Sequence, residues 1–222
     1  DNVIGKFGGV ATLGGNLMER TSTGLSSSLK ELIAPNLFWL TNGKDSDRSI
    51  NPSYSHRKTN SLYGSLSINY DGWAFLEGTF RNDWSSTLIK KNRSYFYPSV
   101  SASWVVSDML NKLDAPLPKW FSYAKARVSF AQVGNDLEPY QLYNTYSIGS
   151  IPYTNGVGAS KGSTLYDSNV RSELISSWEA GMEIRFLDNR LGIDVAWYKS
   201  NARRQLLNLP MNSLSGYEQR KI

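Results

Sequence analysis

Glu179 and Glu183 are the pair of residues whose spacing comes nearest to a catalytic arrangement. In a strand both carboxylates would lie on one face, and such pairs cleave glycosidic bonds when a cleft gives them different environments. His56 is the only histidine, so a catalytic triad or a multi-histidine metal site lacks ligands. Asp45 and Asp47 resemble the start of a calcium loop, but no glutamate follows at the required offset. We therefore expect no enzyme, no cofactor and no catalytic metal.

Composition narrows the class of protein without deciding it. The chain has 222 residues, 40% of them hydrophobic, and its net charge of +5 is spread along the sequence, so we expect no nucleic-acid partner. It has no cysteine, which excludes disulfides and thiolate metal sites. The sequence has no run of about 18 apolar residues, so it predicts no membrane-spanning helix. The search for a long apolar run does not detect the strands of a transmembrane barrel, because only alternate residues of such a strand face lipid.

The carboxylates of Glu179 and Glu183 would be positioned by a hairpin whose turn lies at Asp188-Asn189. A two-residue turn there sets a register in which one side of the ribbon is apolar. That side pairs Phe186 with Leu191, Ile184 with Ile193, Met182 with Val195 and Ala180 with Trp197. The other side sets Glu179, Gly181, Glu183 and Arg185 against Tyr198, Ala196, Asp194 and Gly192. Such a ribbon suits either a sandwich with one wet face or the wall of a transmembrane barrel.

Strand length favours the barrel. A strand that crosses a bilayer needs about 9–11 residues, whereas strands of soluble proteins usually have about five or six. The alternation predicts strands over residues 4–18, 58–70, 73–83, 94–106, 122–132, 174–186 and 190–201. Most of these are long enough to span.

The connections alternate between long and short, as in outer-membrane barrels. Long segments cover residues 19–57, 84–93 and 134–173, and tight turns lie at Asp71-Gly72 and Asp188-Asn189. Residues 108–121, with helical character, are the exception at the short end. Structureless loops of this length would be uncommon in a soluble domain.

A three-residue loop at 71–73 gives the second hairpin a consistent register, with Gly72 free to take a positive φ. It places Ile68 opposite Leu76 and Ser67 opposite Glu77. Glu77, Thr79 and Arg81 then look into a lumen, and Ala74, Leu76 and Phe80 face lipid. Aromatic residues gather in two belts typical of a membrane interface, with Trp73, Trp104 and Trp120 at the short-turn end and Trp84, Tyr95, Tyr97, Trp178 and Trp197 at the loop end.

Several runs carry a family resemblance. They are residues 81–88 and 92–104, then 177–181, 185–192 and 198–200, and, for loop regions, 18–25 and 54–57. These runs resemble SusC/RagA-type TonB-dependent transporters over most of the chain. The family implies a barrel of 22 strands around an N-terminal plug, located in the outer membrane of a Gram-negative, Bacteroidota-like bacterium.

The resemblance also implies function and partners. Such transporters take up glycan oligomers or peptides, with a SusD-like surface lipoprotein as lid and the TonB complex acting on the plug. With about seven strands and no plug domain, signal peptide or TonB box, residues 1–222 are expected to be a partial β-barrel domain, because so few strands cannot close a channel. The alternatives are a soluble carbohydrate-binding β-sandwich and a glycoside hydrolase fragment.

Two groups of site residues follow from this reading. Candidates for contact with the lumen or plug are Glu77, Arg81, Glu179, Glu183, Arg185 and Asp194. Glu183 opposite Asp194 requires a compensating cation, either Arg185 or one from the plug. Candidates for contact with substrate or lid, in the extracellular loops, are Phe38, Trp39, Tyr140, Tyr143, Tyr146 and Tyr153; they could equally pack on one another.

Overall fold

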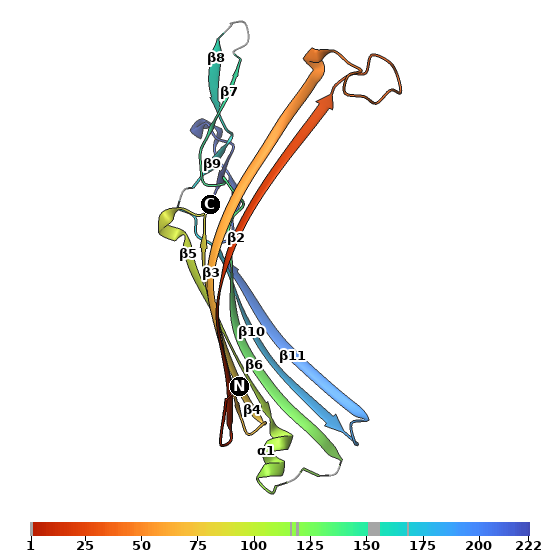
Figure 1. Ribbon diagram of the computed structural model, residues 1–222, viewed down its shortest axis with the longest axis vertical. Coiled ribbons are helices and arrows are strands. Elements are labelled where there is room, and N and C mark those ends of the chain that lie inside the picture. The colour runs from red at the N-terminus through yellow and green to blue at the C-terminus, as the bar shows by residue number, and fades with distance from the viewer. Residues whose placement is uncertain (1, 116, 119, 151–155, 168) are drawn as a thin grey trace.

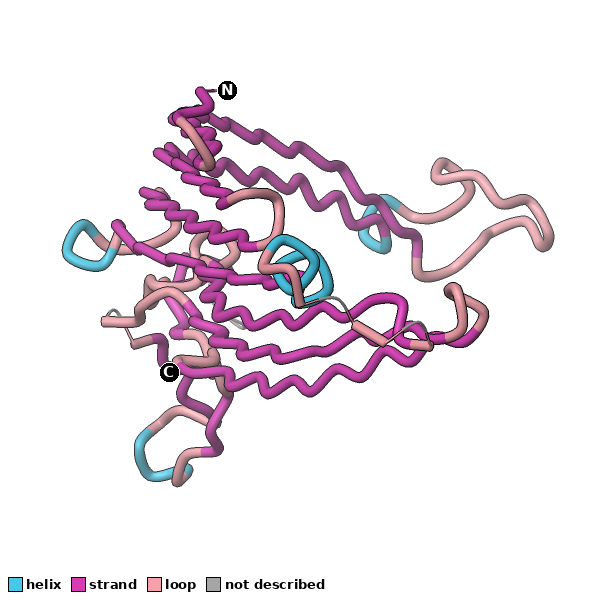
Figure 2. The backbone as a smooth tube through the Cα atoms, turned by 90° about the horizontal axis from the view of Figure 1, so that it is seen from below, coloured by secondary structure: helices cyan, strands magenta, loops and turns pink. Residues whose placement is uncertain are grey.

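The computed structural model of the chain describes residues 2–115, 117, 118, 120–150, 156–167 and 169–222. Its main feature is an antiparallel sheet of eight strands in the order β1-β2-β3-β4-β5-β6-β10-β11 (Figure 1). They are β1 (Asn2–Ile4), β2 (Phe7–Leu29), β3 (Arg48–Tyr70), β4 (Ala74–Ser85), β5 (Ser94–Val105), β6 (Phe121–Asn135), β10 (Glu173–Phe186) and β11 (Leu191–Arg203). Seen from below, the sheet is strongly curled (Figure 2).

Smaller elements lie in the connections and beyond β11. They are α1 (Val106–Lys112), the 3-10 turns η1 (Asp45–Asp47), η2 (Lys90–Asn92) and η3 (Ser213–Ser215), the hairpin β7 (Tyr146–Ser150) and β8 (Val157–Lys161), and the small sheet of β9 (Thr164–Tyr166), β12 (Asn208–Pro210) and β13 (Gln219–Lys221). None of the helices in the described ranges has both the length and the apolar content needed to span a bilayer.

The β10-β11 hairpin has the predicted register. Ile184 lies opposite Ile193, and the remaining predicted pairs follow along both strands. The turn has positive φ at Asp188 (51°) and Asn189 (65°), as a type I′ turn requires, and the amide of Arg190 donates to the carbonyl of Leu187. Turn chemistry and alternation therefore determine this hairpin together.

The β3-β4 hairpin also has the predicted three-residue loop. Ile68 lies opposite Leu76, and the loop places Asp71 at φ 50° and Gly72 at φ 75°. The strand before β2 was not predicted: a tight turn at Gly5, with φ 64°, separates β1 from β2, where one strand over residues 4–18 was expected.

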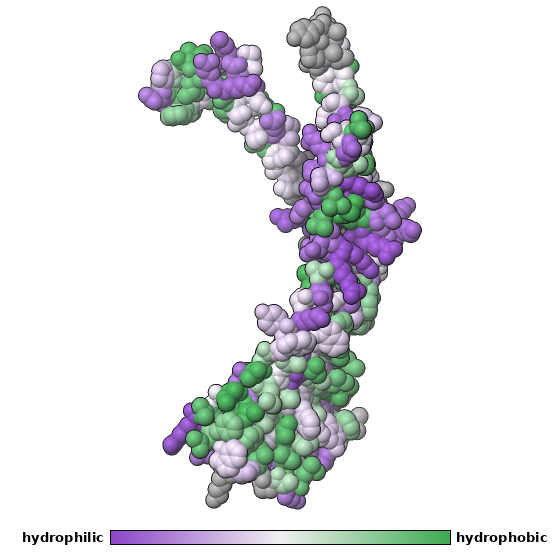
Figure 3. All heavy atoms as spheres, turned by 180° about the vertical axis from the view of Figure 1, so that it is seen from behind, coloured by the Kyte–Doolittle hydropathy of each residue, from purple (hydrophilic) through white to green (hydrophobic). Residues whose placement is uncertain are grey.

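The two faces of the sheet differ in what they expose. On one face the apolar side chains of the outer strands stand free, with Met182 50% and Trp197 58% accessible. Figure 3 shows hydrophobic residues gathered over the short-turn half of this molecule, with hydrophilic residues above them. A soluble sandwich would bury such a face under a second layer, which the described residues do not provide. That alternative is therefore not supported.

The hairpin of β2 and β3 is much longer than predicted. Each strand has 23 residues and the ladder continues to Leu29 opposite Arg48, so most of the 19–57 segment is strand and not loop. His56, expected in a loop, lies on β3 opposite Thr21, whose hydroxyl is 3.2 Å from the His56 Nδ1. The upper part of this hairpin carries Ser and Thr on both faces, so the alternation that reveals a strand is absent there.

Connections alternate along the sheet as predicted. The turns at residues 5–6, 71–73 and 187–190 and the α1 segment lie at one end, and the long connections lie at the other (Figure 1). The buried apolar core is small and sits in the long connections, where Leu88, Leu137 and Leu142 pack together. The sheet therefore has little protein core of its own.

Candidate functional site

The six residues predicted to face a lumen lie on one face of the sheet. Glu77 is opposite Ser101, Ser101 is opposite Ser129, and Ser129 is opposite Glu179, so one row of pairs crosses four strands. Side chains an even number of residues apart on a strand share a face, and so do residues paired across strands. The remaining candidates therefore lie on this face as well: Arg81, Glu183, Arg185 and Asp194. We call it the polar face.

Five charged residues on the lower polar face, from β6, β10 and β11, are paired within the sheet. Arg127 of β6 contacts two acids, with its Nη2 3.1 Å from Asp194 Oδ1 and its Nε 3.6 Å from Glu179 Oε1. Arg185 Nη2 lies 2.6 Å from Glu183 Oε1. The expected compensation of Glu183 and Asp194 therefore involves two arginines. Both glutamates of the possible glycosidase pair already hold an arginine partner.

Arg127 was missed by sequence reasoning, although the signal was available. Residues 123, 125, 127 and 129 of β6 are Tyr, Lys, Arg and Ser, and they alternate with Ala, Ala, Val and Phe at 124, 126, 128 and 130. This alternation places the Arg127 guanidinium on the polar face, opposite Ser103 and Gly181.

A second polar cluster lies higher on the same face. Arg81 Nε donates to Asp83 Oδ1 at 2.9 Å and its Nη2 donates to Ser61 Oγ at 2.8 Å. The hydroxyl of Tyr97 donates to Asp83 Oδ2 at 2.5 Å. Tyr97 and its stacked neighbour Tyr95 therefore belong to the polar face, and their predicted place in the outer aromatic belt was wrong.

Asp136 joins the sheet to the long connection after β6. Its side chain is 1% accessible and it accepts hydrogen bonds from Arg57, Ser85 and Thr87. The adjacent Leu137 lies in the buried apolar cluster. Residues 136–142 are thereby fixed onto the interior of β3 and the end of β4, as a platform above the polar face.

The loop aromatics are exposed and form separate groups. Phe38 and Trp39 are 83% and 68% accessible, and they lie at the tip of the β2-β3 hairpin. In Figure 1 this tip stands apart from the β7-β8 hairpin. The second group, on the side of the β7-β8 hairpin, comprises the exposed Tyr140, Tyr143 and Tyr146. Tyr153 lies outside the described residues.

Aromatic pairs mark both ends of the apolar face. Trp73 and Trp104 have ring centroids 6.5 Å apart near the short turns, and Trp120 stacks on Phe186 at 5.9 Å. Trp178 packs against a phenylalanine of β6 at 4.6 Å toward the loop end. These pairs lie where the two belts are predicted, and the belts themselves stay a prediction.

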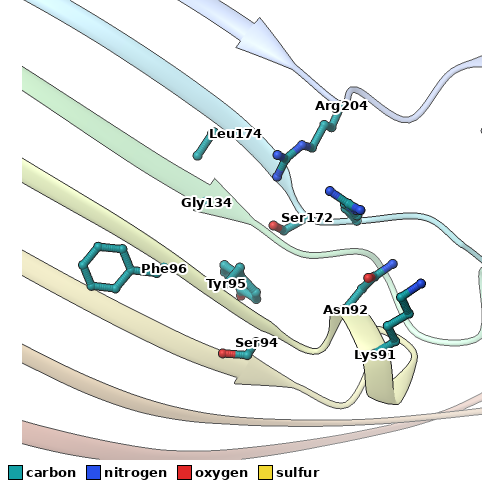
Figure 4. Close-up of a pocket in the computed structure, with 10 residues that line it drawn as sticks. Lys91, Asn92, Ser94, Tyr95, Phe96, Gly134, Ser172, Leu174 and Arg204 are labelled. Atoms are coloured by element: carbon teal, nitrogen blue, oxygen red, sulfur yellow. The ribbon is translucent and has the colours of Figure 1, made fainter.

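A pocket of about 450 Å³ opens near the loop ends of β5, β6 and β10 (Figure 4). The β5-β6 ladder begins at Ser99 opposite Ala131 and does not include the part of β5 before it. Pro98 has no N–H to donate there. Lys91, Arg171 and Arg204 line the pocket with Phe96 and other residues.

Comparisons with known proteins agree with this geometry. Residues 6–219 match the family described as TonB dependent receptor-like, beta-barrel. TonB-dependent receptor P26 of Formosa agariphila is 25% identical over 231 residues, which cover 96% of this chain and 22% of that protein. TonB-dependent receptor P3 of the same organism is 26% identical over 162 residues, covering 70% of this chain and 16% of that protein.

The fold has a close counterpart among solved structures. A chain of the RagAB peptide transporter superposes with a TM-score of 0.83 at 21% identity, over 100% of this chain and 24% of that chain. This chain therefore spans about a quarter or less of the length of each of these three proteins. Members of the matched family are receptors and transporters, in agreement with the expectation that the chain is not an enzyme. The chain belongs to the TonB-dependent receptor-like β-barrel family and is located in the outer membrane of Gram-negative bacteria.

Proposed function

We propose that residues 1–222 form part of the lipid-embedded wall of a larger, 22-stranded barrel that imports oligomeric nutrients. One observation carries this proposal: over the short-turn half of the sheet, β3, β4, β10 and β11 are paired in a register that makes one face apolar and uncovered while the other face carries charged residues. In a bilayer the apolar face contacts lipid and the polar face lines the lumen.

The polar face is suited to hold a plug domain. Glu77 has no ion-pair partner among the described residues. A plug that carries a cation opposite Glu77 would pair with it. Arg81, Glu179, Glu183, Arg185 and Asp194 on the same face are the further candidates for plug contact.

Peptides or glycan oligomers are the proposed cargo. RagAB, whose fold this chain shares, is a peptide importer. Exposed aromatic rings such as Trp39 and Tyr143 can stack on sugars or pack on peptide side chains. A SusD-like surface lipoprotein would cover the loops, and the TonB complex would act on the plug.

Adjacent residues of β11 test the orientation of the sheet. Nitroxide labels at Val195→Cys and Ala196→Cys, in the full-length protein in liposomes, would be compared by their relaxation with oxygen and with a water-soluble nickel chelate. We expect oxygen, which partitions into lipid, to relax the label at 195, and the nickel chelate to relax the label at 196. The opposite result would refute the proposed wall.

Uptake tests the function itself. Cells that carry the full-length protein should accumulate a labelled oligopeptide or oligosaccharide, and a protonophore should abolish the accumulation. Uptake that persists after the membrane is de-energised would contradict energised import. The absence of uptake of both the oligopeptide and the oligosaccharide would contradict import of these oligomers.

A further inference from the structure

The pocket in the split between β5 and β6 has an excess of positive charge. Lys91, Arg171 and Arg204 line it, and none of its ten lining residues is acidic. Within the described parts of the chain, none of the three cations forms an ion pair. The nearby Asp167 is instead bound by Arg220, at 2.8 Å.

The positions of these cations are supported by local structure. Asn92 Nδ2 donates to the carbonyls of Asn169 and Val170, at 3.2 and 3.0 Å, and ties η2 to the segment before β10. Lys91 and Arg171 are the next residues on either side of this junction. Arg204 follows β11 with φ 59°, a left-handed conformation that is uncommon outside glycine, asparagine and aspartate. Figure 4 shows the side chains of Lys91 and Arg204 around the opening.

The lower part of the pocket belongs to the apolar face. Phe96 lines it and stacks on Phe80 at 6.3 Å, and Leu174 shares the parity of Trp178 on β10. The cations therefore lie just beyond the outer aromatic belt, on the loop side. In a membrane this is the level at which lipid headgroups meet the barrel.

We propose that this pocket binds the phosphate groups of a phosphorylated glycolipid in the outer leaflet. Arginine and lysine bind phosphate through charge-assisted hydrogen bonds, and Phe96 and Leu174 contact the first part of an acyl chain. The proposal goes beyond nutrient import, and it rests on the proposed orientation of the sheet, which the labels at residues 195 and 196 test independently.

Native mass spectrometry of the full-length protein, titrated with bis-phosphorylated lipid A, tests the site. The triple variant Lys91→Gln, Arg171→Gln, Arg204→Gln should bind lipid A about a hundredfold more weakly, since each cation near an anionic surface contributes on the order of a fivefold effect. The matched control Arg20→Gln, Lys30→Gln, Lys44→Gln removes the same charge from exposed positions on β2 and its loop. It should bind as the wild type does.

Two further arms identify the ligand source. Dephosphorylated lipid A should bind to the wild type as weakly as lipid A binds to the triple variant, and inorganic phosphate at millimolar concentration should leave lipid A bound. Displacement of lipid A by inorganic phosphate would assign the pocket to a free anion. Equal binding of lipid A to the triple variant and the control would overturn the proposal, even if nutrient uptake is intact.

Discussion

Asp136 is the residue whose loss should most affect the platform above the polar face. Replacing it with alanine leaves the partly buried Arg57 and the buried Ser85 and Thr87 without their shared acceptor. Breaking such a buried pair costs about 3 kcal/mol. We expect amides of residues 136–142 to exchange hydrogen more than tenfold faster in the Asp136→Ala variant of the full-length protein, with the strands below unchanged.

Glu138 provides the control for this experiment. It lies two residues further along the same connection, is exposed, and has no ion-pair partner among the described residues. Glu138→Ala should leave exchange at 136–142 unchanged. Equal acceleration in both variants would show that Asp136 does not hold the platform.

Asp71 makes one of the short turns sensitive to pH. Its carboxylate lies 2.7 Å from Lys112 Nζ and 3.4 Å from Lys6 Nζ, and the hydrogen bond from Lys112 is the largest cause that lowers its pKa below 3.8. Because the pKa of the Asp71 carboxyl is lower in the folded state than in the unfolded state, its ionisation stabilises the folded state above pH 3.8. This stabilisation disappears as the pH falls through the lowered pKa.

The expected consequence appears in thermal unfolding of the full-length protein. Asp71→Asn should lower the melting temperature at pH 7, and the difference from the wild type should vanish as the pH falls well below 3.8. Asparagine tolerates the positive φ of this position, so strain is not introduced. Asp114→Asn, also at positive φ but without an ion pair in the described structure, should show no such pH-dependent difference.

At the scale of elements, prediction from sequence succeeded where one face of a strand is apolar. The pairs Ile184 with Ile193 and Ile68 with Leu76 follow from alternation and turn chemistry alone. It failed over the upper half of β2 and β3, where Ser and Thr occur on both faces and the ladder depends on backbone hydrogen bonds. The Asp136 platform could not be predicted either, because it joins residues far apart in sequence.

The length of β2 and β3 predicts which part of the hairpin the barrel needs. At about 3.3 Å per residue a 23-residue strand extends about 75 Å, more than twice the roughly 30 Å of hydrocarbon. Replacing residues 21–56 with Asn-Gly keeps Arg20 opposite Arg57. The full-length protein should therefore still fold, as shown by heat-modifiable migration in gels.

A deletion lower in the same hairpin is the matched test. Removing residues 13–16 and 61–64 preserves the register between β2 and β3 and the alternation of both strands. It shifts the upper part of β3 by four residues against β4 and shortens both strands by about 13 Å within the apolar zone. We expect loss of the heat-modifiable form. If the upper replacement abolished folding while the lower deletion did not, the assignment of the bilayer-spanning part would be wrong.

At the scale of the whole molecule, the sheet bears two structures that extend beyond the apolar zone. One is the long β2-β3 hairpin, and the other comprises the platform with β7 and β8 (Figure 1). Both expose aromatic side chains at a distance from the lumen wall. Exposed aromatic residues on projecting loops are typical of protein interfaces, so a partner that covers the barrel would contact both.

The hairpin tip should therefore contribute to the affinity for the proposed SusD-like lipoprotein. Phe38→Ala with Trp39→Ala in the full-length protein should weaken binding of the purified lipoprotein by at least about thirtyfold, as loss of an interface hot spot does. Leu214→Ala, which removes a 95% exposed side chain on η3, is the control for loss of exposed apolar surface. Equal affinities of the tip variant and the wild type, measured by interferometry with folded protein, would show that the lipoprotein does not contact this tip.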